Sequence, residues 1–242
     1  MRQDGRVLPE GSRVALLLPG SVPYVETVIG LLTAGVVPIP LDPKLTDAER
    51  DAILDDLDPQ LVVTDPETLA RLRSAYPMGL PRARPMHVTS GTTGRPKGVW
   101  SGILDDVDAQ ALIAEERDLW GFTAADVNLV LSPIHHSAPL RFAMGTLLAG
   151  GRVVGLERPG FDPGTVTEVI RTERPTTMFC VPTHLQRLFR HWDDTAWPNL
   201  SSFRLVAHAG APCPDPAKRR LIEVFPPGST WEFYGSTEGQ FT

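Results

Sequence analysis

The sequence has little cysteine, no long apolar run and no excess of positive charge, and each shortage excludes a class of protein. It holds two cysteines in 242 residues, which excludes a disulfide scaffold and favours a reducing compartment. Its most apolar stretch, residues 28–41, is interrupted by glycine and proline and is too short to span a membrane. The net charge of −6 argues against a nucleic-acid-binding face. We therefore expect a cytoplasmic protein with neither nucleic acid nor a membrane as partner.

Motifs for zinc and for a catalytic nucleophile are missing as well. The adjacent residues His135 and His136 have no Cys-x2-Cys or His-Glu-x-x-His pattern around them, so a structural or pocket-wall role is favoured over a metal site. No Gly-x-Ser-x-Gly elbow occurs, which argues against a serine hydrolase. Cys180 and Cys213 are interpreted as core or turn residues.

What the sequence does contain is a regular alternation of strand and helix signals. Short apolar runs at 13–18, 60–64 and 205–208 read as buried strands, and Thr46 with Glu49 forms a capping box that opens a helix. Strands that alternate with helices imply parallel pairing through crossover helices. The sequence therefore predicts an α/β fold, a layered sandwich of mostly parallel sheets flanked by helices, with ligands at the carboxyl ends of strands.

A proline-rich segment at 77–85 marks the best candidate for a boundary. It divides the chain into a first αβ subdomain, 1–84, and a second, 85–242. The second is expected to contain a long helix from Gly102 to Trp120, with apolar residues such as Ile103 at helical spacing.

One segment, directly after a predicted strand, concentrates groups that bind phosphate. Within ten positions it has four hydroxyls, three glycines and one lysine, in the order Thr89-Ser90-Gly91-Thr92-Thr93-Gly94-Arg95-Pro96-Lys97-Gly98. Glycines let successive backbone N–H groups turn toward an anion, and the lysine adds a point charge. Pro96 occupies the place of the second glycine of a Walker A loop, so that motif is excluded. A return strand at 98–100 instead predicts a strand–loop–strand clasp over a polyphosphate.

This segment resembles the phosphate loop of the adenylate-forming superfamily, which includes acyl-CoA synthetases, luciferase and the adenylation domains of peptide synthetases. Three further segments are similar to motifs of that superfamily, in the same order and at similar spacing: 133–139 (Pro-Ile-His-His-Ser-Ala-Pro), 209–212 (Ala-Gly-Ala-Pro) and 234–238 (Tyr-Gly-Ser-Thr-Glu). The resemblance implies the superfamily's large N-terminal domain. Because the superfamily's chains continue well past the last motif, we expect a truncated domain without the C-terminal lid.

The resemblance also implies roles for individual residues. Catalysis is assigned to Lys97, Thr237 and Glu238, with Glu238 as the Mg²⁺ ligand, and the acyl pocket to His136 and Gly235. The residues assigned to ATP or AMP are Thr89, Ser90, Gly91, Thr92, Thr93, Gly94, Lys97, Gly210, Ala211, Pro212, Tyr234, Gly235 and Thr237. Tyr234 and the turn 210–212 would form the two walls of a flat slot for adenine.

The reaction that the resemblance implies is the activation of a small-molecule carboxylic acid by ATP to an acyl-adenylate. The acyl group would then pass to the thiol of coenzyme A or of a phosphopantetheine arm. A carboxylate has a reference pKa near 4 and is already ionised at neutral pH, so the first step requires no general base. Positioning and charge stabilisation would carry the reaction.

Three alternatives remain open from the sequence. The chain is a truncated ligase, or a half-enzyme that needs a partner chain for the lid, or a non-catalytic nucleotide- or acyl-binding module. A dimer or a partner chain covering the truncated edge is expected. The sequence departs from the superfamily's pattern at Val88, His135 and Ala209, where an aromatic residue, Phe or Tyr, and Gly are usual.

Overall fold

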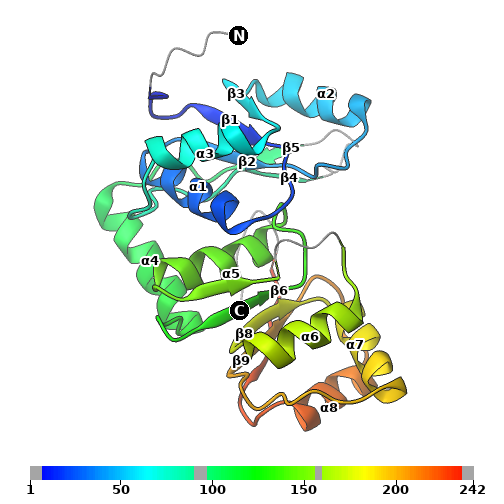
Figure 1. The fold of residues 1–242 in the computed structure, drawn as a ribbon. Helices are drawn as coiled ribbons and strands as arrows, with labels where there is room; N and C mark the ends of the chain where they lie inside the picture. The colour runs from blue at the N-terminus through cyan, green and yellow to red at the C-terminus, as the bar shows by residue number, and fades with distance from the viewer. Residues whose placement is uncertain (1–6, 90–96, 156–159, 236–242) are drawn as a thin grey trace. The chain divides into compact units, whose positions relative to one another are not determined.

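The computed structural model describes residues 7–89, 97–155 and 160–235 (Figure 1). Its contacts divide the chain into two compact units, Met1–Arg117 and Asp118–Thr242. This division differs from the boundary after residue 84 that the sequence predicts for the subdomains, which stays a prediction. No helix in the described ranges combines the length and the apolar character that a membrane crossing requires.

The first unit is built on a three-stranded parallel sheet in the order β2-β1-β3. Its strands are β1 (Arg13–Leu16), β2 (Val37–Pro40) and β3 (Leu61–Val63), and its first helices are α1 (Val22–Thr33), α2 (Asp47–Leu57) and α3 (Pro66–Ala75). The two prolines of β2 lie on the edge of this sheet, where a missing backbone donor is tolerated.

Side-chain caps at the starts of these helices confirm the predicted boundaries. Ser21 Oγ accepts a hydrogen bond from the backbone N–H of Tyr24 at the start of α1. At α2, Thr46 and Glu49 form the reciprocal capping box that their spacing predicts. Such caps satisfy backbone donors that the first turn of a helix leaves without partners.

A two-stranded antiparallel hairpin follows, made of β4 (His87–Thr89) and β5 (Lys97–Val99), with Thr89 opposite Lys97. It confirms the pairing of the two predicted strands on either side of residues 90–96. The next helix, α4 (Asp106–Trp120), begins later than predicted. Asp105 Oδ1 accepts the backbone N–H groups of residues 107 and 108, and Gly102 has a φ of +91°, so the chain turns at 102–105 and Ile103 lies before the helix.

The second unit contains a five-stranded parallel sheet in the order β10-β9-β8-β6-β7. The strands are β6 (Val127–Val130), β7 (Arg152–Val154), β8 (Thr177–Cys180), β9 (Leu205–His208) and β10 (Thr230–Glu232), and the helices are α5 (Ser137–Leu148), α6 (Pro163–Glu173), α7 (Pro182–Asp194) and α8 (Asp215–Val224). Helices α6, α7 and α8 pack on one face through a core that includes Met178 and Trp192. The other face packs against α5, where Phe142 contacts Phe179.

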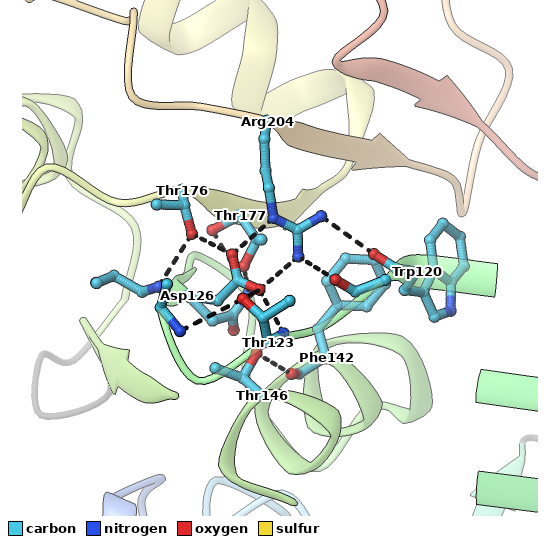
Figure 2. A network of polar contacts seen from close by, with 12 residues as sticks. Trp120, Thr123, Asp126, Phe142, Thr146, Thr176, Thr177 and Arg204 are labelled. Carbon is cyan, nitrogen blue, oxygen red and sulfur yellow. Dashed lines mark hydrogen bonds and ion pairs between the residues drawn. The ribbon is translucent and has the colours of Figure 1, made fainter. Parts of the chain in front are cut away.

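A network of polar contacts joins the amino ends of three strands of this sheet (Figure 2). Asp126, directly before β6, is 2% exposed and accepts hydrogen bonds from Thr123, Thr176 and Arg204. Thr176 directly precedes β8 and Arg204 directly precedes β9. Burial would raise the pKa of Asp126, but its hydrogen bonds with Arg204 and Thr176 outweigh burial and hold that pKa below its usual value. The carboxylate is therefore charged at neutral pH and fixes the strand starts.

Candidate functional site

The segments that follow β6, β9 and β10 lie at one edge of the sheet of the second unit. All pairings in this sheet are parallel, so the carboxyl ends of its strands point the same way. Residues 131–136 follow β6, residues 209–212 follow β9 and residues 233–235 follow β10. Three of the four motifs singled out in the sequence therefore begin at this edge, where ligands of open α/β sheets bind.

The turn after β9 adopts a backbone conformation that favours glycine. Gly210 has a φ of +87°, and a Cβ at this position would meet the Val181 side chain at 3.4 Å. The backbone N–H of Ala209 donates to the carbonyl of Cys180, which fixes the point where the turn leaves the sheet. Gly210, Ala211 and Pro212 are all exposed, so this turn presents backbone and small side chains to solvent.

The segment after β10 is anchored by one aromatic residue and exposes the next. The backbone N–H of Phe233 donates to the carbonyl of His208, and its ring packs against Trp120 and Phe179 at centroid distances of 5.3 and 5.8 Å. Tyr234, in contrast, is 78% exposed. An exposed ring on an anchored backbone can stack on a planar group. Its assignment to adenine remains a prediction.

The segment after β6 leads into α5, and His136 occupies the N-cap position of that helix with extended backbone angles. His136 is exposed, and its ring lies 4.3 Å from that of His135, centroid to centroid. Within the described ranges no group of three or more His, Cys, Asp or Glu residues could hold a metal ion. The two histidines thus lack the additional ligands of a zinc site in this part of the chain.

In the first unit, the hairpin brings the two ends of the predicted phosphate loop together. Thr89, at the end of β4, is partly buried, and Lys97, at the start of β5, is exposed. Five predicted loop residues and two from the last motif lie outside the described residues: Ser90, Gly91, Thr92, Thr93, Gly94, Thr237 and Glu238. Their roles, including that of Glu238 toward Mg²⁺, stay predictions.

The structure also shows a charged cluster at this edge that the sequence did not reveal. Lys218 Nζ, in the first turn of α8, lies 2.7 Å from Glu232 Oε2 at the end of β10. His208, at the end of β9, is in register with Glu232 and is 2% exposed. The hydrogen bond from Lys218 lowers the pKa of Glu232, and burial lowers the pKa of His208. The cluster could not be found from spacing, because its members come from three elements.

The comparisons with known proteins agree with this arrangement. The family model described as AMP-binding enzyme matches residues 7–81 and 86–241, which is nearly the whole chain. The chain belongs to the AMP-binding enzyme family. The match confirms the resemblance that the four motifs carry, and it includes the hairpin of the first unit and the carboxyl edge of the second.

Relatives of this family member are acyl-CoA ligases. The chain is 32% identical to a feruloyl-CoA synthase of Amycolatopsis sp over 88% of its own length and 47% of the relative's. It is 27% identical to the 4-chlorobenzoate–CoA ligase of Pseudomonas sp. (strain CBS-3), over 96% of its own length and 49% of the relative's. The chain thus spans about half the length of the curated relatives it matches.

Solved structures show the same fold. The structure of ATP-bound MatB from Rhodopseudomonas palustris superimposes with a TM-score of 0.72 at 28% identity, covering 97% of this chain and 51% of that one. The predicted α/β fold with parallel sheets flanked by helices is confirmed by this likeness and by the strand pairings.

Proposed function

We propose that this family member takes part in the ATP-dependent activation of a carboxylic acid and the transfer of the acyl group to a thiol. The observation that carries the proposal is the family match over residues 7–81 and 86–241. It agrees with the relatives, which are named as acid–CoA ligases, and with the ATP bound to the MatB structure. Because those proteins are about twice as long, the activity is proposed for the protein to which this chain contributes. A cytoplasmic location stays a prediction.

In the proposed first step, a carboxylate oxygen of the acid attacks the α-phosphorus of ATP. The new oxygen–phosphorus bond forms as the bond to the bridging oxygen of the β-phosphate breaks, and pyrophosphate leaves with its electron pair. The hairpin of the first unit would bind phosphate oxygens through backbone N–H groups, hydroxyls and the Lys97 ammonium. Tyr234 and the turn 210–212 would hold the base.

In the second step, a thiolate attacks the acyl carbon, the carbon–sulfur bond forms and AMP leaves. Coenzyme A is the acceptor that the relatives' names favour, and a phosphopantetheine arm has the same chemistry. Mg²⁺ prefers oxygen ligands and binds nucleotides through few protein carboxylates. One carboxylate, proposed as Glu238, fits this chemistry, and the ion would neutralise charge on the phosphates. His136, exposed at the start of α5, is proposed to line the acyl pocket.

Carboxylate-dependent ATP–pyrophosphate exchange tests the proposal. The chain is assayed alone and together with the C-terminal half of the feruloyl-CoA synthase, against a panel of carboxylic acids. Lys97→Ala is expected to lower exchange about 100-fold, because a charge on the phosphates is lost. Lys44→Ala is the matched control, since Lys44 is also an exposed lysine of the first unit. Equal activity of the two variants would contradict the role of Lys97.

A non-catalytic nucleotide-binding module is the second candidate. This candidate predicts ATP binding by the chain without exchange under any supplement. A half-enzyme predicts exchange only with the added polypeptide. The same assay therefore separates the two functions, and the absence of any ATP binding would exclude both.

A further inference from the structure

The carboxyl ends of β9 and β10 carry a charged cluster whose members stand next to the two walls of the proposed base slot. His208 is the last residue of β9, and the turn 209–212 starts directly after it. Glu232 is the last residue of β10, and Phe233 and Tyr234 follow. In a parallel pair, residues in register share a face of the sheet, so His208 and Glu232 lie side by side on the face that α7 and α8 cover.

The ion pair between Lys218 and Glu232 connects the segments that carry those two walls, the turn 210–212 and Tyr234. Lys218 is in the first turn of α8, which begins just after the turn 209–212, and its backbone N–H donates to the carbonyl of Pro214. Its Nζ lies 2.7 Å from Glu232 Oε2, two residues before Tyr234. The segment after one wall is thereby tied to the segment before the other.

We propose that Lys218 and Glu232, with His208 beside them, are positioning residues that set the separation of the turn 210–212 from Tyr234 and, through it, the affinity for the base of a nucleotide. This inference rests on the proposed function, because the base slot does. None of the three residues has to touch the nucleotide. They act through the backbone segments that they join.

Protonation of His208 would make the ion pair between Lys218 and Glu232 depend on pH. Its Nδ1 is buried and has no hydrogen-bond partner among the described residues. The charged groups that act on it are Glu232 of β10 and Lys218 of α8, and Cys180 of β8 is in register with it. The Cys213 thiol lies near the same two charges and near Asp215. Burial lowers the pKa of His208 below its usual value, so it is neutral at pH 7. On acidification the imidazolium would attract Glu232 and repel Lys218, which weakens the ion pair.

The test measures ATP affinity of the 242-residue chain by isothermal titration calorimetry. Lys218→Met and Glu232→Gln are each expected to lower the affinity about fivefold. The double variant should lose no more than either single one, because both remove the same interaction. The charge-reversed pair Lys218→Glu with Glu232→Lys should return the affinity to within about twofold of wild type.

The chain offers a matched control in the same helix. Arg220 of α8 pairs with Asp193 of α7, and the exposed side-chain fractions are 36% and 43%, the same as for Lys218 and Glu232. Arg220→Met should lower the melting temperature at least as much as Lys218→Met, since Arg220 also lies over the Trp197 ring. It should leave ATP affinity unchanged, because its partner is not next to the base slot.

His208→Gln supplies a readout that a merely structural role would not move. In wild type the ATP affinity should fall as pH drops from about 7 to 5, and in the variant this fall should be smaller by at least threefold. Unchanged affinity in Lys218→Met and Glu232→Gln, or an equal loss in Arg220→Met, would overturn the inference and leave the proposed function standing. Absence of ATP binding by the wild-type chain would overturn the inference as well.

Discussion

The two ends of the five-stranded sheet use polar residues in opposite ways. At the amino ends, Asp126 is buried and its two carboxylate oxygens accept hydrogen bonds from three side chains and a backbone N–H (Figure 2). At the carboxyl ends, Tyr234 and the turn after β9 are exposed. The amino end therefore stabilises the fold, while the carboxyl end presents groups that a ligand can contact.

The largest effect on stability is expected where the amino-end network is broken. Arg204→Met leaves a buried carboxylate without its charged partner and should lower the free energy of unfolding by about 2 kcal/mol. Urea denaturation measures this change. ATP affinity should stay within about twofold of wild type. Arg152→Met is the control at the same sheet edge, because Arg152 pairs with Glu173 in an exposed ion pair. It should cost less than about 0.5 kcal/mol, and an equal cost for both variants would contradict the account.

The same network predicts how acid acts on the protein. The pKa of Asp126 is lowered in the folded state, so its contribution to stability is present above its unfolded value of 3.8 and is lost as pH falls through the lower folded value. Without Arg204 that folded pKa rises, because the largest of the contributions that oppose burial is lost. The acid-unfolding midpoint of Arg204→Met, followed by tryptophan fluorescence, should therefore lie at higher pH than that of wild type. A midpoint at the same or lower pH would show that Asp126 is not held by Arg204.

At the carboxyl end the expected effects are on binding rather than on stability. Tyr234→Ala removes an exposed ring and should lower ATP affinity about tenfold, the usual value of one base–aromatic stack. Its free energy of unfolding should change by less than about 0.5 kcal/mol. Tyr234→Phe keeps the ring and should bind ATP within about twofold of wild type. If calorimetry shows that Tyr234→Ala and Tyr234→Phe have the same weakened affinity for ATP, stacking by Tyr234 is excluded.

The smallest effect is expected from replacing one glycine by alanine at each end of the sheet and comparing the two variants. Gly210→Ala and Gly228→Ala both place a side chain at a positive φ, +87° and +78°, and should each cost about 1 kcal/mol of stability. Gly210 belongs to the turn after β9, whereas Gly228 lies just before β10. Calorimetry should therefore show weaker ATP binding for Gly210→Ala alone. Equal ATP affinity of the two variants would contradict the difference between the two ends of the sheet.

The strands, helices and caps could be predicted because their signals are local. Thr46 and Glu49 lie three positions apart and make the capping box that their spacing indicates. The predicted start of α4 was wrong. Ile103 fits a helical pattern, but Asp105 caps the helix further on. The contact between Asp126 and Arg204 spans 78 positions and depends on which strands become neighbours. No local pattern encodes that order.

The candidate site could be predicted only in outline, because local patterns do not show which segments become neighbours. Resemblance identified Gly210 and Tyr234, and parallel pairing of β9 with β10 brings the segments that carry them to one edge. The ion pair of Lys218 with Glu232 joins a helix to a strand and could not be inferred from either segment alone. The predicted loop residues 90–94 and Glu238 lie outside the described residues and stay predictions.

Hydrogen exchange of the chain with and without saturating ATP, read peptide by peptide, tests most directly whether the carboxyl end of this sheet binds nucleotide. The account predicts slower exchange in peptides that contain residues 209–214 and 233–235, and unchanged exchange in peptides that contain residues 123–126 and 174–177. Protection confined to the amino-end peptides, or no protection at the carboxyl end, would contradict it.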